Sequence, residues 1–213
     1  MIENDLTGFA PLDFFFSEEV GCYPVSDPAA SALSKKHLMP ALSELYGKEP
    51  FADVFMGWHP AGLAFQFTVE QEAPLAVCYP DIRHGDSIEL FIDTRANLLA
   101  KTTSRFYHHF FFLPEQFEGR SSGECTRFRT EDSHPLATQE QLDFTISATK
   151  KGYKAAIFIP KECLVGYDPE RGSKLGLTYR VNRADGEYQP FAINYDQPRV
   201  DASPNLFVTV GLQ

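Results

Sequence analysis

Three carboxylates lie close together in a short run that alternates apolar and other residues. Asp86, Glu89 and Asp93 lie on or beside the segment from Ile88 to Ile92. Glu89 and Asp93 share a strand face, but four residues along a strand span about 13 Å, too far for one metal ion or for the carboxylate pair of a retaining glycosidase. A partner carboxylate would have to come from another strand, and the sequence singles none out. Acidic residues on a solvated sheet face also need no functional role. Both interpretations of these carboxylates, as site residues and as solvated surface residues, therefore stay open.

Two adjacent histidines, His108 and His109, are the next candidates for chemistry. Neighbouring residues on a strand point to opposite faces, so at most one of the two rings faces any groove. The simplest interpretation is a histidine packed beside phenylalanine on a sheet. A zinc or iron site that combines one of them with His84 or His134 is the alternative, but nothing in the sequence defines the ligand geometry. We therefore predict no metal site.

Local signatures of catalysis and nucleotide binding are absent from the sequence. It contains no GxSxG turn, no GxxxxGK[ST] loop and no GxGxxG loop. Four cysteines lie far apart without a CxxC pair, which favours free thiols; two disulfides stay open if the protein is exported. We predict a protein that is not an enzyme, although a triad assembled from distant residues stays open.

Length and charge limit the classes of partner. The 213 residues suit one domain, and a net charge of −10 argues against nucleic acid or an anionic membrane as partner. No apolar run is long enough for a membrane span, and the acidic N-terminus does not resemble a signal peptide. The sequence as written therefore predicts a cytoplasmic protein, or an exported one if an upstream signal was removed.

The elements that must position these residues are mostly strands. Aromatic residues make up 14% of the chain, which favours strand-rich structure. Alternation with a period of two predicts nine strands: Asp53 to Trp58, Leu63 to Val69, Ile88 to Asp93, Phe106 to Leu113, Leu142 to Thr149, Tyr153 to Ile159, Leu175 to Asn182, Gln189 to Tyr195 and Leu206 to Val210. We expect an all-β fold, an antiparallel β-sandwich of the jelly-roll type.

Segments outside these strands are predicted as helix or loop. Asp27-Pro28 predicts a helix start before Ala29 to Tyr46, which Pro40 interrupts, so only short helices fit there. The first 25 residues, with the ring cluster Phe14 to Phe16, are predicted to be a loop or edge segment. Thr94 to Ser104 and Glu115 to Gln141 are predicted to be long polar loops. We expect one domain over 1–213, with 1–50 as an extension carrying the short helical segment and 51–213 as the sandwich.

Five segments in order resemble the family 9 carbohydrate-binding modules and their DOMON-like relatives, over about residues 50–213. The segments are Asp53 to Val69, Gly85 to Asp93, Gly152 to Pro160, Lys174 to Asn182 and Ser203 to Val208. The resemblance implies a β-sandwich that is mostly non-catalytic. In sugar-binding members of the family, the ligand's ring lies between two tryptophans, and polar side chains on the concave sheet hydrogen-bond its hydroxyls.

The same resemblance assigns candidate ligand-binding residues. Glu89 matches the family's glutamate, Arg180 and Asn182 fall where polar binding residues occur, and His108 or His109 lies on a further contact strand. The two stacking tryptophans are missing, because Arg83 and His84 stand near the first position and Arg199 near the second. The lone Trp58 matches a structural position. A groove rimmed by Arg83, His84 and Arg199 is expected to suit an anionic ligand better than a neutral sugar.

Three functional hypotheses follow. The first is a non-catalytic binding domain for a sugar or anionic saccharide in a concave sheet groove. The second is an interaction or structural protein that keeps the fold, binds no small molecule and contacts a protein partner through its long loops. The third, from the DOMON-like resemblance, is haem binding through Met56 with His108 or His109. We expect no cofactor, and a structural calcium ion at Asp93-Thr94 or at Asp185 to Glu187 is left open.

Overall fold

The computed structural model describes residues 19–27, 33–47, 49–97, 100, 102–192 and 203–213. Strands dominate it, and its helical elements within these ranges are short 3-10 turns. The strands are β1 (Glu19–Pro24), β2 (Ala52–His59), β3 (Gly62–Glu70), β4 (Ser87–Asp93), β5 (Tyr107–Phe117), β6 (Arg120–Glu124), β7 (Asp143–Thr149), β8 (Gly152–Pro160), β9 (Lys174–Asn182), β10 (Tyr188–Pro190) and β11 (Val208–Leu212). The 3-10 turns are η2 (Lys35–His37), η3 (Leu42–Tyr46), η4 (Ile82–His84), η5 (Gln139–Gln141), η6 (Lys161–Cys163) and η8 (Pro204–Leu206).

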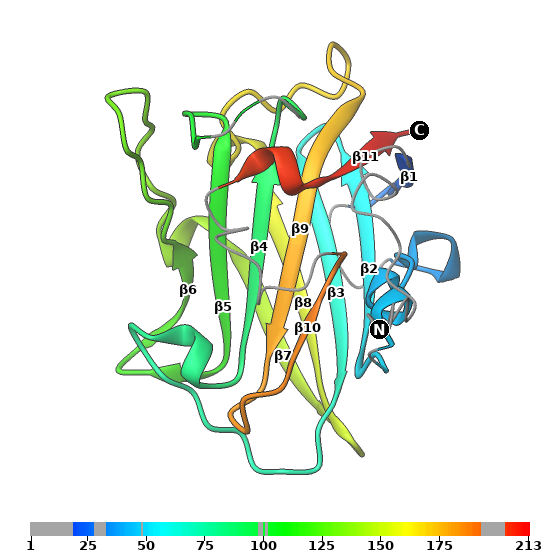
Figure 1. Cartoon of the computed structure of the whole chain (residues 1–213), viewed down its shortest axis with the longest axis vertical. Coiled ribbons are helices and arrows are strands. Elements are labelled where there is room, and N and C mark those ends of the chain that lie inside the picture. Colours follow the sequence, from blue (N-terminus) through cyan, green and yellow to red (C-terminus); the bar gives the residue numbers. More distant parts are fainter. Residues whose placement is uncertain (1–18, 28–32, 48, 98–99, 101, 193–202) are drawn as a thin grey trace, which may run out of the picture.

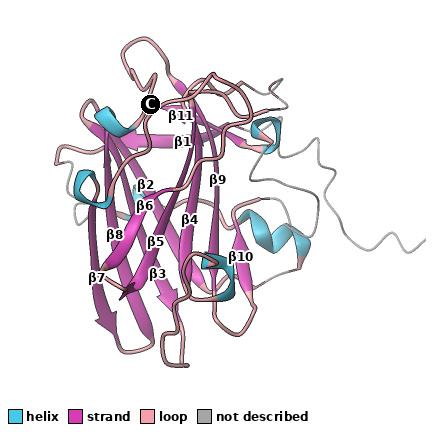
Figure 2. Cartoon of the chain, turned by 90° about the vertical axis from the view of Figure 1, so that its left-hand side faces the viewer, coloured by secondary structure: helices cyan, strands magenta, loops and turns pink. Residues whose placement is uncertain are grey.

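The strands form two layers that are joined through β1 (Figure 1). One layer has the order β6-β5-β4-β9-β11, with β10 also paired to β9, and the other has the order β2-β3-β8-β7. In Figure 2, β7 and β8 lie on one side of the molecule and β9 and β10 on the other. Strand β1 pairs in parallel with both β11 and β2, whereas the remaining pairs are antiparallel. The predicted β-sandwich is confirmed.

The core lies between the layers and contains the apolar residues that alternate along the strands. Ile88, Leu90 and Ile92 of β4 and Phe65 and Phe67 of β3 are fully buried in one cluster. An edge-to-face contact between Phe67 and Tyr179 of β9, with ring centroids 5.7 Å apart, joins the two layers. Strand β8 alternates buried and half-buried residues as a two-sided strand should.

Strand β4 departs from the expected half-buried pattern. All seven of its residues are buried, including Glu89 and Asp93. The interpretation of these two acids as members of a solvated sheet face was therefore wrong. Their side chains lie on the outer face, but other side chains and turns cover that face.

Two strands occur where the sequence predicted loops. Strand β1 lies in the segment expected to be a loop or edge, and β6 lies within the expected loop Glu115 to Gln141. Neither strand shows strong apolar alternation in its sequence. Its extended conformation comes instead from backbone pairing with a neighbouring strand, β11 for β1 and β5 for β6. The ring cluster Phe14 to Phe16 lies outside the described residues.

The other differences are small shifts at the ends of elements. The short helices predicted between Ala29 and Tyr46 occur within the described residues as the 3-10 turns η2 and η3, on either side of Pro40, and Pro204–Leu206 is a 3-10 turn before β11. Part of the predicted strand Gln189 to Tyr195 lies outside the described residues, and its described portion contributes β10. Strands β7 and β8 form a hairpin with Lys150-Lys151 at its turn; Gly152 has φ +143°, and a Cβ there would lie 2.1 Å from the Val69 carbonyl oxygen. No described helix is both long and apolar enough to cross a membrane.

Candidate ligand-binding site

A row of polar side chains crosses the outer face of β5, β4 and β9. Glu89 lies opposite Arg180, and Ser87 lies opposite Asn182, in the antiparallel β4–β9 register. Phe91 lies opposite His109 in the β4–β5 register. Because these residues alternate with Ile88 and Leu90, their side chains lie on the opposite face of the sheet, where Phe91 stacks on His109 and packs against Phe207 within the buried hydrophobic cluster.

Glu89 is the centre of this row. Arg83 of η4 binds it at two points, with its Nε 2.9 Å from Oε1 and its Nη2 3.0 Å from Oε2. Asn182 donates from Nδ2 to Oε1 over 3.1 Å, and His109 Nε2 lies 2.9 Å from Oε2. A carboxylate offers about four lone-pair sites, so these three partners use the acceptor capacity of Glu89.

The electrostatics of the row follow from burial and these contacts. Burial alone would raise the pKa of Glu89, but hydrogen bonds and charge from His109 and Arg83 outweigh it and lower this pKa to about 2. Burial likewise works against a charged His109, but its contacts with Cys125 and Glu89 prevail and raise the pKa of the ring to about 9. The carboxylate and the imidazole therefore support each other's charged form.

Two further residues belong to the site, and sequence reasoning missed both. The Sγ of Cys125 lies 3.4 Å from Nδ1 of His109, so the Cys125 thiol contacts the His109 ring, which in turn contacts the Glu89 carboxylate. Tyr188 of β10 lies under the guanidinium of Arg180, 4.0 Å from ring centroid to Cζ. No local motif marks either residue, because only strand pairing and the segment after β6 bring them to the row.

The structure brings five of the eight predicted residues together. Arg83, Glu89, His109, Arg180 and Asn182 form the row. His84 does not join it: its side chain is 78% exposed and its Nδ1 lies 2.7 Å from Asp81 Oδ2. Arg199 lies outside the described residues. Of the expected rim, the structure describes only Arg83 and His84: Arg83 lies over the sheet against Glu89, and His84 is directed at Asp81.

His108 points to the other side of the sheet. Its ring stacks beside Phe110, with centroids 5.7 Å apart, as the simplest interpretation predicted, and its Nδ1 lies 3.0 Å from Oε1 of Glu124. The same oxygen lies 2.7 Å from Nε2 of His134. Burial opposes the ionised form of Glu124, but the hydrogen bonds with the two histidines outweigh it and lower its pKa to about 2. His108 thus belongs to a second cluster and not to the row.

The remaining candidates have structural contacts. Trp58 packs against the core from β2 and donates its Nε1–H to the Gln213 carbonyl over 3.1 Å. Met56, a predicted haem ligand, is buried in β2. Asp93 accepts the amides of Arg95 and Asn97, and Asp185 accepts that of Glu187, so these turn acids already serve as backbone acceptors.

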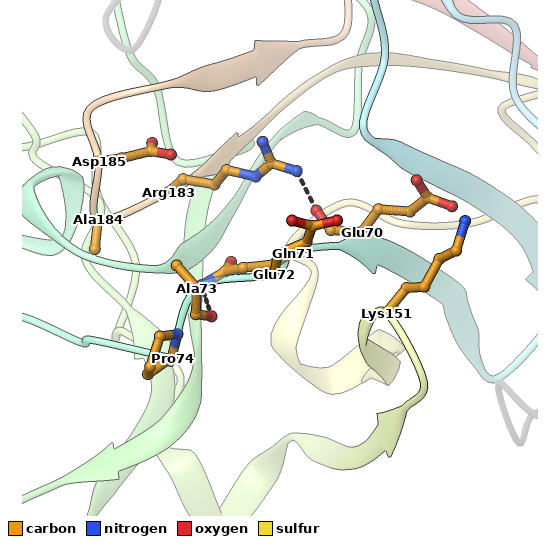
Figure 3. A pocket seen from close by; sticks show the side chains of 9 residues that line it. All are labelled: Glu70, Gln71, Glu72, Ala73, Pro74, Lys151, Arg183, Ala184 and Asp185. Atoms are coloured by element: carbon orange, nitrogen blue, oxygen red, sulfur yellow. Dashed lines mark hydrogen bonds between the residues drawn. The ribbon is translucent and has the colours of Figure 1, made fainter.

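Two cavities lie away from the row, and none of the row residues lines either of them. A cavity of about 480 Å³ lies beside the ends of β3 and β9, where Arg183 reaches the Glu70 carbonyl (Figure 3). Lys151, Glu72 and Asp185 add charges of both signs to its wall. The candidate site is thus separate from both cavities, and Ser87, Glu89 and Asn182 within it are buried.

Solved structures of other proteins share the fold of this chain. No protein-family model and no curated protein matches the chain. A family 9 carbohydrate-binding module from Caldicellulosiruptor kristjanssonii in complex with glucose aligns with a TM-score of 0.66 over 92% of this chain and 96% of that one, at 14% identity. The module in complex with cellotriose gives a TM-score of 0.65 over 92% and 94%, at 13% identity. The chain therefore has the β-sandwich fold of the family 9 carbohydrate-binding modules, as its motifs predicted.

Proposed function

We propose that this chain is a non-catalytic binding domain that holds an acidic saccharide against the outer face of β5, β4 and β9. The solved modules of similar fold carry glucose and cellotriose, which supports a saccharide as the ligand class. The polar row supplies directional partners for hydroxyl groups, and its guanidinium groups suit a carboxylate.

The observation that carries the proposal is that the Glu89 carboxylate already accepts hydrogen bonds from protein side chains. Its two oxygens already accept from Arg83, Asn182 and His109, so it is poorly placed to accept from sugar hydroxyls as well. The side chain of Arg83 remains 32% exposed and Arg180 is half-buried, so two arginines beside one buried carboxylate are partly accessible to solvent. Such a surface favours a ligand with its own carboxylate, such as a uronic acid.

Tyr188 adds an apolar face to this surface. Its ring is half-buried beneath Arg180, which fixes the guanidinium plane and provides a ring beside which sugar C–H groups can pack. This arrangement replaces the missing tryptophan pair with a smaller platform, so we expect weaker binding than a two-tryptophan site gives.

The test compares acidic with neutral saccharides of matched size. Calorimetric titration with an oligogalacturonide should show binding, and cellotriose and glucose should bind at least tenfold more weakly. Arg180→Gln should reduce binding of the acidic ligand by about 10- to 100-fold, because it removes one charge-assisted contact. Arg171→Gln is the matched control, since Arg171 is 88% exposed beside Asp168.

Two outcomes would overturn the proposal. Tight binding of neutral sugars that Arg180→Gln leaves unchanged would refute the acidic ligand. No binding of any saccharide would favour the alternative, an interaction protein that keeps the fold. Thermal shift provides an independent readout, because a ligand at a hundred times its dissociation constant stabilises the native state by about 2.7 kcal/mol.

A further inference from the structure

A second polar cluster lies on the core side of β5, away from the polar row. It joins His108 of β5, Glu124 of β6 and His134 of the segment between β6 and η5. One ligand atom from each of the three lies within 4.8 Å of the others. The side chains of His108 and Glu124 are 0% exposed and that of His134 is 3% exposed. Buried ionisable groups gathered in this way are either paired with one another or bound to a metal ion.

The contacts of His134 indicate which of its two ring nitrogens carries the hydrogen and which presents a lone pair to Glu124. Its Nδ1 lies 2.7 Å from the Arg105 carbonyl oxygen, which only accepts, so Nδ1 carries a hydrogen. Nε2, 2.7 Å from Oε1 of Glu124, then presents a lone pair to a carboxylate oxygen. Two lone pairs at that distance repel each other unless a cation, either a second proton or a metal ion, lies between them.

The same oxygen is shared by several groups, whereas its partner oxygen is held elsewhere. Oε1 of Glu124 also faces Nδ1 of His108 at 3.0 Å and accepts from the Thr126 hydroxyl over 2.7 Å. Oε2 accepts the backbone N–H of Ala137 over 2.9 Å. One carboxylate oxygen is thus directed at two imidazole nitrogens, while the other is fixed by the backbone.

These outer contacts are those that orient metal ligands in proteins. A metal-binding histidine usually donates its second N–H to a carbonyl, as His134 does to Arg105, and a ligating carboxylate is itself hydrogen-bonded, as Glu124 is by Ala137. Nε2 of His108 is buried and makes no hydrogen bond within the part of the chain that the structure describes. Nδ1, which lies 3.0 Å from Oε1 of Glu124, is therefore the nitrogen of this ring that is placed to bind an ion.

We propose that His108, Glu124 and His134 form a structural binding site for a divalent transition-metal ion, with zinc as the best fit. Two imidazoles and one carboxylate suit zinc, whereas calcium and magnesium prefer oxygen ligands. Ligands about 2.0–2.1 Å from a tetrahedral zinc lie roughly 3.3 Å from one another, so the two Glu124–histidine distances of 3.0 and 2.7 Å have to open by only a few tenths of an ångström. The Thr126 hydroxyl or a water molecule takes the fourth position. This site was not predicted from the sequence, where the combination of His108 with His134 was only an alternative.

The ion would join the long polar segment after β6 to the sheet. His134 lies in that segment, and its neighbour Ala137 pairs with Glu124 through both its N–H and its carbonyl. The segment begins at Cys125, which contacts His109 of the polar row. Metal binding is thus expected to stabilise the segment after β6 that contacts His109, without the ion touching a saccharide bound at the polar row.

The test measures zinc bound to the untagged full chain after chelation and reloading. Elemental analysis should find about one zinc ion per chain, and excess zinc at a hundred times its dissociation constant should raise the melting temperature by about 5–10 °C. Cobalt in place of zinc should give the visible absorption of a tetrahedral site, which reports the ligand set directly. None of these readouts depends on saccharide binding.

Matched histidine variants distinguish this cluster from chance metal binding. His134→Ala should lose bound zinc and the thermal shift, whereas His84→Ala, which removes a histidine 78% exposed outside the cluster, should keep both. If Glu124→Gln does not fold, the His134 variant and the cobalt spectrum of the unmodified protein still decide the question. The proposal is overturned if the unmodified chain takes up no zinc, or if His134→Ala binds as much zinc as the unmodified chain; the cluster is then a proton-linked network.

Discussion

The Arg83 guanidinium grips the Glu89 carboxylate at two points, Nε to Oε1 over 2.9 Å and Nη2 to Oε2 over 3.0 Å. Arg83 comes from the short turn η4, and Glu89 lies in the middle of β4. The pair anchors this turn to the outer face of the sheet. A residue expected at the rim of a groove is therefore part of the support for the buried carboxylate.

Removing Arg83 should destabilise the fold. Arg83→Met leaves a carboxylate that is 1% exposed with Asn182 and His109 as its remaining partners. We expect a loss of about 2–4 kcal/mol in the free energy of unfolding, somewhat less than for a fully buried pair because Arg83 is partly exposed. Urea denaturation measures it. Arg171→Met, at an exposed ion pair, should change stability by less than about 1 kcal/mol, and equal effects of the two variants would contradict this account.

Acid should weaken the fold through Glu89. Its folded pKa of about 2 lies below the ordinary value of 4.5, so ionised Glu89 stabilises the native state above that ordinary value. The contribution is lost as the pH falls from about 4.5 towards 2. Melting temperatures across this range should fall less steeply for Glu89→Gln than for the unmodified chain. Parallel curves for the two proteins would show that Glu89 is not the group responsible.

Trp58 should report unfolding and not ligand binding. It is the single tryptophan of the chain, it packs against the core from β2, and the polar row lies on β5, β4 and β9 in the other layer. Its fluorescence should change on denaturation and stay constant during saccharide titration, and Trp58→Phe should bind normally. Tyr188→Ala, which removes the ring under Arg180, should instead weaken binding several-fold. A change in Trp58 fluorescence on saccharide binding would show that the ligand binds near Trp58 and not at the polar row.

The cysteines should differ in reactivity. All four are free thiols; Cys22 and Cys163 are buried, and burial raises their pKa values to about 12 and about 11. Cys78 and Cys125 are half-buried. Limited iodoacetamide treatment followed by peptide mass spectrometry should therefore find Cys78 and Cys125 modified well before the other two. Equal labelling under native conditions would indicate that the buried pair is more open than the structure shows.

The strands were largely predictable because alternation with a period of two is a local property. Leu63, Phe65 and Phe67 mark a strand whatever it pairs with, and they are buried as their pattern indicates. Strand β6 was not predictable, because Arg120 to Glu124 is short and polar and takes its conformation from pairing with β5. The same reason explains why β1 was expected to be a loop or edge.

The candidate site divides in the same way. The sequence alone determined that the chain forms a β-sandwich, that Glu89 alternates with core residues, and that His108 and His109 point to opposite faces. Only the tertiary structure decided that His109 joins Glu89, that His108 meets Glu124 and His134, and that Arg83 covers the carboxylate. Residues within one strand are placed by local backbone geometry, whereas contacts between strands depend on register, and a shift of one residue would exchange the two faces.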